Sequence, residues 1–318
     1  MVKSSNITSH QTSGIIEYAR LEIDTLIITG RISTAKNYTT VTKSFGKWLG
    51  SDIIPTRIDN TLLLRYASYL TTERHLCRNS ISFHMRILKV LITKSLSKYG
   101  IHPAADLFDH IYTGADSTRR RAIPESILIE LNNMNIESAG MNLARDTFMM
   151  SFYTRGMAFI DLAQLRWRDL TPDLSEISYV RHKTSKRIHM SVEPCLRALL
   201  DKYGPGKNDT YILPWLSPTN QLNTNDAYRE YKTAINTYNR ALRDISTMLS
   251  VRCGRHIQLT SYVARHSWAS AARHLGIPIA VISAGLGHSS ERTTEIYLSR
   301  IETSQVDIAN RLILSKFN

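Results

Sequence analysis

Cysteine is scarce in this chain of 318 residues, and the three present are Cys77, Cys195 and Cys253. They are odd in number and widely spaced. They therefore form neither the framework of a disulfide-rich secreted domain nor the paired pattern of a zinc site. Reduced cysteines in a cytosolic protein are the simplest interpretation.

Long apolar segments are also missing. No run approaches the roughly 18 apolar residues that a membrane-spanning helix needs. The first residues, MVKSSNITSHQTSG, lack the apolar core of a secretory signal. We therefore expect a cytoplasmic protein without a membrane-spanning segment.

Acidic residues are outnumbered by basic ones. There are 40 Lys and Arg against 27 Asp and Glu, which gives a net charge of +13. This balance favours a polyanionic partner. The basic residues are spread along the chain, as on a folded body with a positive surface. Charge alone leaves DNA, RNA, an anionic membrane and a basic protein without a nucleic-acid role all open.

Helical periodicity dominates the first third of the chain. Four helices are predicted, at about 14–29, 33–49, 60–73 and 80–99. The second is expected to begin with Ser33 or Thr34 as its N-cap. The fourth carries an apolar stripe at helical spacing: Ile81, Met85, Leu88, Ile92, Leu96 and Tyr99.

A basic segment, Thr118–Arg121, is typical of a linker between domains. Beyond it, Ile177–Arg181 and Arg187–Val192 alternate like two strands and predict a β-hairpin. Beyond Asp226 the pattern is helical almost to the end. We therefore predict a mainly α protein, with an all-α domain at 1–112 and, at 113–318, a mostly α domain that contains a small antiparallel sheet.

An arginine, a histidine and a tyrosine stand near the C-terminus, as Arg265, His288 and Tyr297. A tyrosine phenol can attack a phosphodiester and conserve the bond energy as a phosphotyrosine. Guanidinium groups suit the extra negative charge of the transition state, and Lys or His can protonate the leaving oxygen. Taken singly, His288 could equally cap a helix, and Tyr297 could lie on an amphipathic helix.

The segment from Leu286 to Tyr297 matches the pattern Leu-Gly-His … Thr-x-x-Tyr without a gap. Together with Arg265, it resembles the C-terminal signature of the tyrosine recombinases, the phage-integrase family. The resemblance implies a four-helix SAM-like core-binding domain followed by a catalytic domain with the DNA breaking-rejoining enzyme fold. It also implies cleavage through a 3′-phosphotyrosine on Tyr297, with His288 and Arg265 on the scissile phosphate and with no cofactor or metal.

Two further positions follow from the resemblance. The family's catalytic lysine lies in a hairpin turn, where Lys183 is the best match, Lys186 is the alternative and a solvated surface lysine is also possible. The family's second arginine lies in His-x-x-Arg, whereas this chain has Tyr262 three residues before Arg265. A phenol can form a hydrogen bond near the phosphate, but it is a weaker general base than imidazole at neutral pH.

The first arginine of the family is missing from its usual position. When the chain is aligned on Asp161 and on Leu165-Arg166-Trp167, that position holds Ala158. Arg155 stands three residues earlier and would share a face with Ala158 if the helix extends back that far. We expect Arg155 to replace it, as the resemblance to recombinases of Bacteroides and relatives implies; the alternative is a surface arginine beside a defective site. Asp161 matches an acid that orients an active-site arginine, although a surface or capping acid is also possible.

The resemblance implies a site-specific recombinase that acts on double-stranded DNA half-sites as a homo-tetramer, with no membrane partner. The C-terminal segment Glu302–Asn318 would dock on a neighbouring protomer, or pack on its own domain. The few residues before the first helix leave no room for an arm-binding domain, which favours an invertase, a resolvase or a small mobile-element integrase. Two alternatives stay open: a related type IB-like topoisomerase, and a catalytically impaired DNA-binding protein, which Ala158 and Tyr262 favour.

Overall fold

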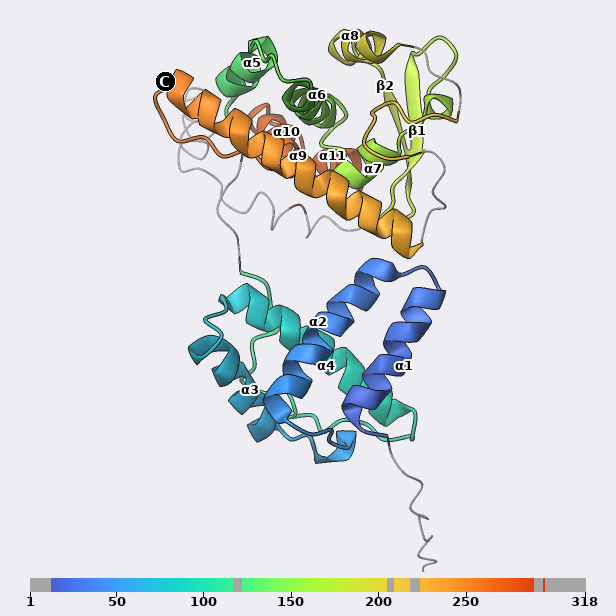
Figure 1. The fold of residues 1–318 in the computed structure, drawn as a ribbon, viewed down its shortest axis with the longest axis vertical. Coiled ribbons are helices and arrows are strands. Elements are labelled where there is room, and N and C mark those ends of the chain that lie inside the picture. The colour runs from blue at the N-terminus through green and yellow to red at the C-terminus, as the bar shows by residue number, and fades with distance from the viewer. Residues whose placement is uncertain (1–12, 117–121, 205–208, 218–223, 289–293, 295–318) are drawn as a thin grey trace, which may run out of the picture. The chain divides into compact units, whose positions relative to one another are not determined.

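The computed structural model describes residues 13–116, 122–204, 209–217, 224–288 and 294. The chain divides into two compact units, which we call the N-terminal unit and the C-terminal unit (Figure 1). The N-terminal unit comprises Met1–Asp116 with Gln221–Tyr228, and the C-terminal unit comprises Ser117–Asn220 with Arg229–Asn318.

Four helices form the core of the described part of the N-terminal unit, as predicted. Helix α4 packs against each of the other three, and α1 and α2 pack along each other (Figure 1). A short 3-10 turn precedes α3. The bounds are α1 Ile15–Ile28, α2 Ile32–Leu49, α3 Asn60–Thr72 and α4 Arg78–Ser97.

The apolar stripe of α4 forms part of this core. Met85, Leu88, Ile92 and Leu96 are buried, whereas Tyr99 lies beyond the helix end and is partly exposed. Aromatic rings from α2 and α3 meet the stripe. Their burial removes a large apolar area from water, which is the main stabilising term of such a bundle.

The start of α2 differs from the prediction. The helix begins at Ile32 with Arg31 as its N-cap, so neither Ser33 nor Thr34 caps it. The reason is the tight turn after α1, in which Gly30 adopts a φ of 73° and the N–H of Arg31 donates to the carbonyl of Leu26 at 2.7 Å. The chain therefore enters the next helix two residues earlier than its capping residues suggest.

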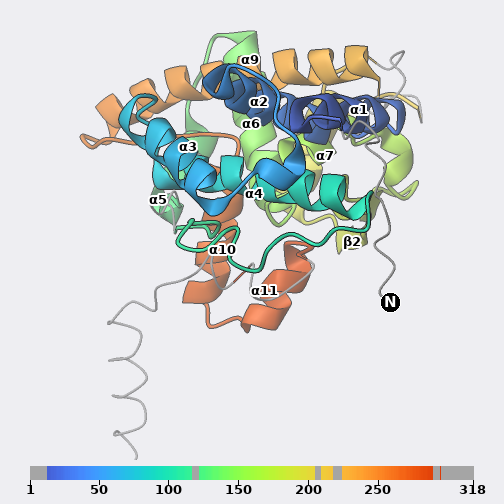
Figure 2. The same cartoon turned by 90° about the horizontal axis from the view of Figure 1, so that it is seen from below.

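The C-terminal unit contains the remaining described helices, with α9 from Arg229 onward, and the two-stranded sheet. Helix α6 contacts α5, α7, α8 and α10, and in Figure 2 helix α9 and the pair α10–α11 lie at opposite sides of this unit. A 3-10 turn at Trp167–Asp169 precedes the sheet. The helix bounds are α5 Glu125–Asn133, α6 Ala139–Tyr153, α7 Phe159–Gln164, α8 Pro194–Tyr203, α9 Asn225–Arg252, α10 Val263–His274 and α11 Ile279–Gly285.

The predicted hairpin is present, with each strand shifted by at most one residue. Strand β1, Glu176–Val180, pairs antiparallel with β2, Arg187–Ser191, and Val180 lies opposite Arg187 at the closed end. Alternate residues of both strands are buried, because only one face of the hairpin packs on the unit.

The helical pattern after Asp226 is interrupted. Helix α9 ends at Arg252, Gly254 takes a positive φ of 62°, and α10 begins at Val263. The hydroxyl of Ser246 accepts the N–H of Leu259 at 2.8 Å, which holds the intervening segment against α9. Within the described residues, no helix combines the length and apolar character that crossing a bilayer demands.

Candidate active site

Arg265 is the centre of the candidate site. It lies in the first turn of α10, and 5% of its surface is exposed. Its Nη1 donates to the carbonyl of Gly156 at 2.7 Å, and its Nη2 donates to the carbonyl of Leu286 at 2.5 Å. The guanidinium therefore ties α10 to the turn that follows α6 and to the turn that follows α11.

His288 completes this turn and is held from both sides of its ring. Its Nε2 lies 3.0 Å from Nη2 of Arg265, and its Nδ1 lies 2.8 Å from the hydroxyl of Thr294, which is fully buried. A guanidinium can only donate. Nε2 must therefore accept, and the proton of the neutral ring sits on Nδ1 and is donated to Thr294. These two contacts fix both the tautomer and the orientation of the ring.

The surroundings of His288 favour its neutral form. Burial is the largest cause, and the positive charges of Arg265, Arg181 and Lys183 act in the same direction, so that the pKa of His288 falls to about 4. His288 is therefore uncharged at neutral pH. The same three cations create a region of positive potential that suits an anion.

The hairpin brings a second buried arginine to this turn. Arg181 follows β1 directly, 6% of its surface is exposed, and its Nη1 donates to the carbonyl of Gly287. The consecutive carbonyls of residues 286 and 287 thus face two different guanidinium groups. The candidate set from the sequence did not include Arg181. The strand alternation held a usable signal, because it places Arg181 on the same face as the buried Ile177 and Tyr179.

Asp161 supports the base of the hairpin turn. It lies in the first turn of α7, is 5% exposed and accepts the N–H of His182 at 2.8 Å. Burial raises the pKa of Asp161, and the His182 N–H together with the charges of Arg181, His182 and Arg265 opposes that rise. Asp161 is therefore a buried acid beside the arginines and not a surface residue.

Two glycines allow the backbone to approach the arginines closely. Gly156 has a φ of 74°, and a Cβ built on it would lie 2.7 Å from Cα of Arg265. Gly287 has a φ of 64°, and its Cβ would lie 2.6 Å from Cδ1 of Ile188 and 3.2 Å from Cδ of Arg181. Both positions require glycine for its conformation and for its lack of a side chain.

The lysine candidates lie in the hairpin turn, as predicted. Lys183 and Lys186 are both exposed. The turn is closed by the N–H of Arg181, which donates to the carbonyl of Lys186 at 2.9 Å. Lys183 acts electrostatically on His288. Lys186 instead lines a hollow of about 420 Å³ together with Arg155 and Trp268.

Arg155 is not on the same helix as Ala158. It lies in the turn between α6 and α7 with a φ of 60°, whereas α7 begins at Phe159 with Ala158 as its N-cap. The premise that a continuous helix places both residues on one face is therefore wrong. The turn forms because the N–H of Gly156 donates back to the carbonyl of Ser151 at 2.7 Å. Arg155 nevertheless directly precedes Gly156, whose carbonyl accepts from Arg265, and the charge of Arg155 acts on Tyr179, as do those of Arg265 and Arg181.

Tyr262 stands at the N-cap of α10, and 46% of its surface is exposed. Its ring lies near that of His266, with centroids 6.2 Å apart. Tyr297, the basic segment Thr118–Arg121 and the C-terminal segment Glu302–Asn318 lie outside the described residues.

The comparisons with known proteins identify the family. The model of the phage integrase family matches residues 126–303, more than half of the chain, and a phage integrase SAM-like domain matches residues 15–104. The chain belongs to the phage integrase family. Its N-terminal unit therefore contains the SAM-like domain, and the candidate site lies within the range that matches the integrase model.

Individual relatives of this phage integrase chain are distant. A tyrosine recombinase of Pseudothermotoga lettingae is 26% identical over 198 residues, a match that covers 61% of this chain and 63% of that protein's length. The Tn1549 transposon integrase in complex with a circular intermediate DNA has a TM-score of 0.67 at 12% identity, covering 94% of this chain and 99% of that one. A lambda integrase dimer bound to a COC′ core site has a TM-score of 0.65 at 15% identity, covering 90% and 95%. These likenesses confirm the fold.

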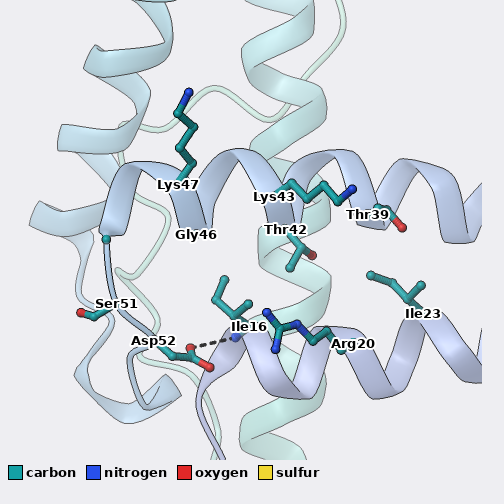
Figure 3. Close-up of a pocket in the computed structure, with 11 residues that line it drawn as sticks. Ile16, Arg20, Ile23, Thr39, Thr42, Lys43, Gly46, Lys47, Ser51 and Asp52 are labelled. Carbon is teal, nitrogen blue, oxygen red and sulfur yellow. Dashed lines mark hydrogen bonds between the residues drawn. The ribbon is translucent and has the colours of Figure 1, made fainter.

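A second hollow of about 430 Å³ lies in the SAM-like part of this phage integrase chain, between α1 and α2 (Figure 3). Arg20 and Lys43 line it, and both are exposed. Thr42 and Arg20 face each other across it, and Lys47 points away from α1 (Figure 3). Asp52 closes one end and accepts the N–H groups of Ile16 and Glu17, at 2.9 and 3.0 Å.

Proposed function

We propose that this chain is a site-specific tyrosine recombinase that cuts and rejoins double-stranded DNA. The observation that carries the proposal is the turn at residues 286–288, where two buried guanidinium groups and a neutral imidazole converge. Positive donors held in a partly buried site suit the charge that develops on a phosphoryl group under attack. Membership of the phage integrase family supports the same chemistry.

The proposed reaction assigns a role to each candidate residue. Tyr297 attacks the scissile phosphate, the P–O5′ bond breaks as the bond from phosphorus to the phenol oxygen forms, and the DNA 3′ end remains on the enzyme as a phosphotyrosine. The phenolic proton is released, and Lys183 protonates the leaving 5′ oxygen. Arg265 donates to the non-bridging oxygens, and His288 donates to them once Nε2 takes up a proton in the DNA complex, because its Nδ1–H is already donated to Thr294. A 5′ hydroxyl of DNA reverses the attack, so no cofactor is needed.

Arg155 and Tyr262 complete the proposed site. In this chain Ala158 occupies the position of the family's first arginine. Arg155 would supply the missing guanidinium to the phosphate instead, as in the Bacteroides-type recombinases. Its position in the turn beside Gly156, whose carbonyl binds Arg265, supports this role. Tyr262, half-exposed and three residues before Arg265, would form a hydrogen bond to the same phosphate.

The organisation proposed for the whole protein rests on the resemblance and on the charge. Residues 1–112 would form the core-binding domain and 113–318 the catalytic domain. The net charge of +13 and the basic hollow at Arg20 and Lys43 support DNA as the partner. The active form would be a cytoplasmic homo-tetramer that exchanges Glu302–Asn318 between protomers and acts as an invertase, resolvase or mobile-element integrase.

One alternative is favoured by a specific observation. Alanine stands at position 158, where the family usually has an arginine, and Tyr262 stands where it usually has a histidine. Both features fit a catalytically impaired protein that binds recombination sites without cutting them. Such a protein would retard DNA in a gel without forming a covalent bond to it.

Covalent trapping separates these possibilities. The wild-type chain is incubated with a pool of short duplexes of randomised sequence. Each duplex carries a nick in the strand that is cut, close to the scissile phosphate on its 3′ side, so that the short fragment with the free 5′ hydroxyl diffuses away. We expect an adduct that survives detergent, from wild type and from Tyr99→Phe, an exposed control, but not from Tyr297→Phe. A gel shift without an adduct would establish the DNA-binding alternative.

The duplexes recovered from the trapped adducts then serve as defined substrates. Recombination requires two such sites and joins them, whereas a type IB-like topoisomerase would relax supercoiled plasmid without exchanging partners. On the same duplexes, Arg155→Ala should form the adduct at least tenfold more slowly than wild type. An unchanged rate would remove Arg155 from the site.

A further inference from the structure

Arg181 is a buried cation that no carboxylate contacts directly, although the charge of the nearby Asp161 acts on it. Only 6% of its surface is exposed, and within the described part of the chain no carboxylate oxygen lies within 4.0 Å of its guanidinium. Its guanidinium donates from Nη1 to the carbonyl of Gly287, and no other hydrogen bond joins the guanidinium to a described residue. Buried charges are normally paired, because an unpaired one loses its hydration without compensation. An arginine in this state suits an incoming anion.

The position of Arg181 is tied to that of Arg265. The two guanidinium groups hold the adjacent carbonyls of Gly287 and Leu286, and His288 follows directly. Arg181 and Arg265 are also two of the three cations whose charge bears on His288. Both guanidinium groups therefore contact the same short turn, and two such groups are the donors that suit a tetrahedral oxyanion.

The missing arginine points to the same place. Ala158 caps α7, and Asp161 lies three residues further along the first turn of that helix. Asp161 accepts the N–H of His182, the residue after Arg181. The start of α7 and the base of the hairpin are thus joined by a direct contact. Residue 158 is an alanine and cannot supply a guanidinium to the phosphate. Arg181 of the hairpin, next to this contact, can supply one.

We propose that Arg181 is a catalytic residue that binds the scissile phosphate, sharing its non-bridging oxygens with Arg265. The proposal rests on the function proposed above and adds to it a residue outside the set that the family signature marks. Arg181 contributes to the transition state by neutralising charge on an oxygen of the phosphate. A purely structural role, in which Arg181 only clamps the turn through Gly287, is the competing account.

The two accounts differ in how they depend on the charge of the phosphate. Replacing one non-bridging oxygen by a methyl group gives a neutral methylphosphonate, which removes the charge that Arg181 would neutralise. A clamp would be needed equally on both substrates. The ratio of wild-type to variant rates on the two substrates therefore reports the role of Arg181 directly.

The test uses the full-length chain and a nicked duplex recovered by covalent trapping with wild type. Single-turnover adduct formation is measured for wild type, Arg181→Ala, Arg181→Lys and the control Arg197→Ala, whose exposed side chain pairs with Asp201 on α8. On the normal phosphate we expect Arg181→Ala to react about 100-fold more slowly, the loss typical of one missing transition-state donor. We expect Arg181→Lys to lose less and the control to match wild type.

The methylphosphonate duplex decides between the two roles. We expect the deficit of Arg181→Ala to shrink at least tenfold on it, and the smaller deficit of Arg181→Lys to shrink in proportion. An equal deficit on both substrates would assign Arg181 to the structural clamp and overturn the proposal. Adduct formation by Arg181→Ala at the wild-type rate on the phosphate would also overturn it, and would remove the clamp as well. If Arg181→Ala does not fold, as judged by its melting curve, the comparison rests on Arg181→Lys. Failure of wild type itself to form an adduct would instead contradict the proposed function.

Discussion

Gly156 offers a sharp test of how the site is packed. Its φ of 74° favours glycine, and an added Cβ would lie 2.7 Å from both Cα and Cγ of Arg265. Gly276, after α10, has a φ of 76°, but nothing lies within 4 Å of its Cβ position. The two glycines share a positive φ of nearly the same size and differ in their surroundings. Alanine at Gly276 therefore measures the backbone strain alone, and alanine at Gly156 measures the strain together with the clash.

The expected magnitudes follow from these two contributions. The left-handed conformation costs a non-glycine residue about 1–2 kcal/mol. Overpacking against a fixed backbone atom adds about 1–3 kcal/mol. Gly156→Ala should therefore destabilise the C-terminal unit by roughly 2–5 kcal/mol, against about 1–2 kcal/mol for Gly276→Ala. A loss of 1 kcal/mol lowers the melting temperature of a domain of about 150–250 residues by about 2–4 °C.

Differential scanning calorimetry provides the stability assay, and covalent trapping provides the activity assay. We expect Gly156→Ala to melt clearly below Gly276→Ala and to form little adduct even at temperatures where it is folded, because Arg265 is pushed away from the turn. Gly276→Ala should keep its activity. Equal melting temperatures, or full activity of Gly156→Ala, would refute the close approach of this turn to Arg265.

Three further outcomes are expected. Asp146→Ala should destabilise the C-terminal unit by about 3 kcal/mol in urea denaturation, because the buried Asp146 carboxylate pairs with Arg145 and Lys202; a loss near zero would contradict that pairing. His288 should make stability depend on pH, because its pKa is about 4 in the folded chain and about 6.5 in the unfolded chain. Its contribution to stability is fully present above pH 6.5 and is lost as the pH falls towards 4. The stability of His288→Gln should fall less over the same pH range. Thr294→Val should cost about 1–3 kcal/mol by leaving Nδ1–H of His288 without its acceptor; nitrogen NMR of the ring would contradict the assigned tautomer if Nε2 carries the proton in wild type.

Local periodicity was enough to predict most of the fold. The helices of the N-terminal unit and the hairpin follow from spacing that each segment carries by itself, as at Met85 and Ile92 of α4. The start of α2 could not be predicted, because a backbone bond from Arg31 to Leu26 overrides the capping preference of Ser33. The break after α9 depends on a hydrogen bond in which the hydroxyl of Ser246 accepts the N–H of Leu259, 13 residues further along the chain.

The candidate site was predictable to a different degree at each residue. Arg265 and His288 stand in a contiguous signature, and the structure brings them into contact. Arg155 required a helix that the positive φ of residue 155 interrupts. The role of Arg181 could not be predicted from local sequence, because it depends on burial and on a contact with Gly287, which is more than a hundred residues away in sequence. Such pairings follow only from the tertiary fold.

The central claim is that Tyr297 becomes linked to DNA. The most direct measurement is mass spectrometry of the adduct formed by wild type on a nicked duplex, after digestion of both protein and DNA. We predict a single modified peptide that carries a nucleotide through a 3′-phosphodiester on Tyr297. A modification on another residue, or none in a preparation that binds the duplex, would contradict the account.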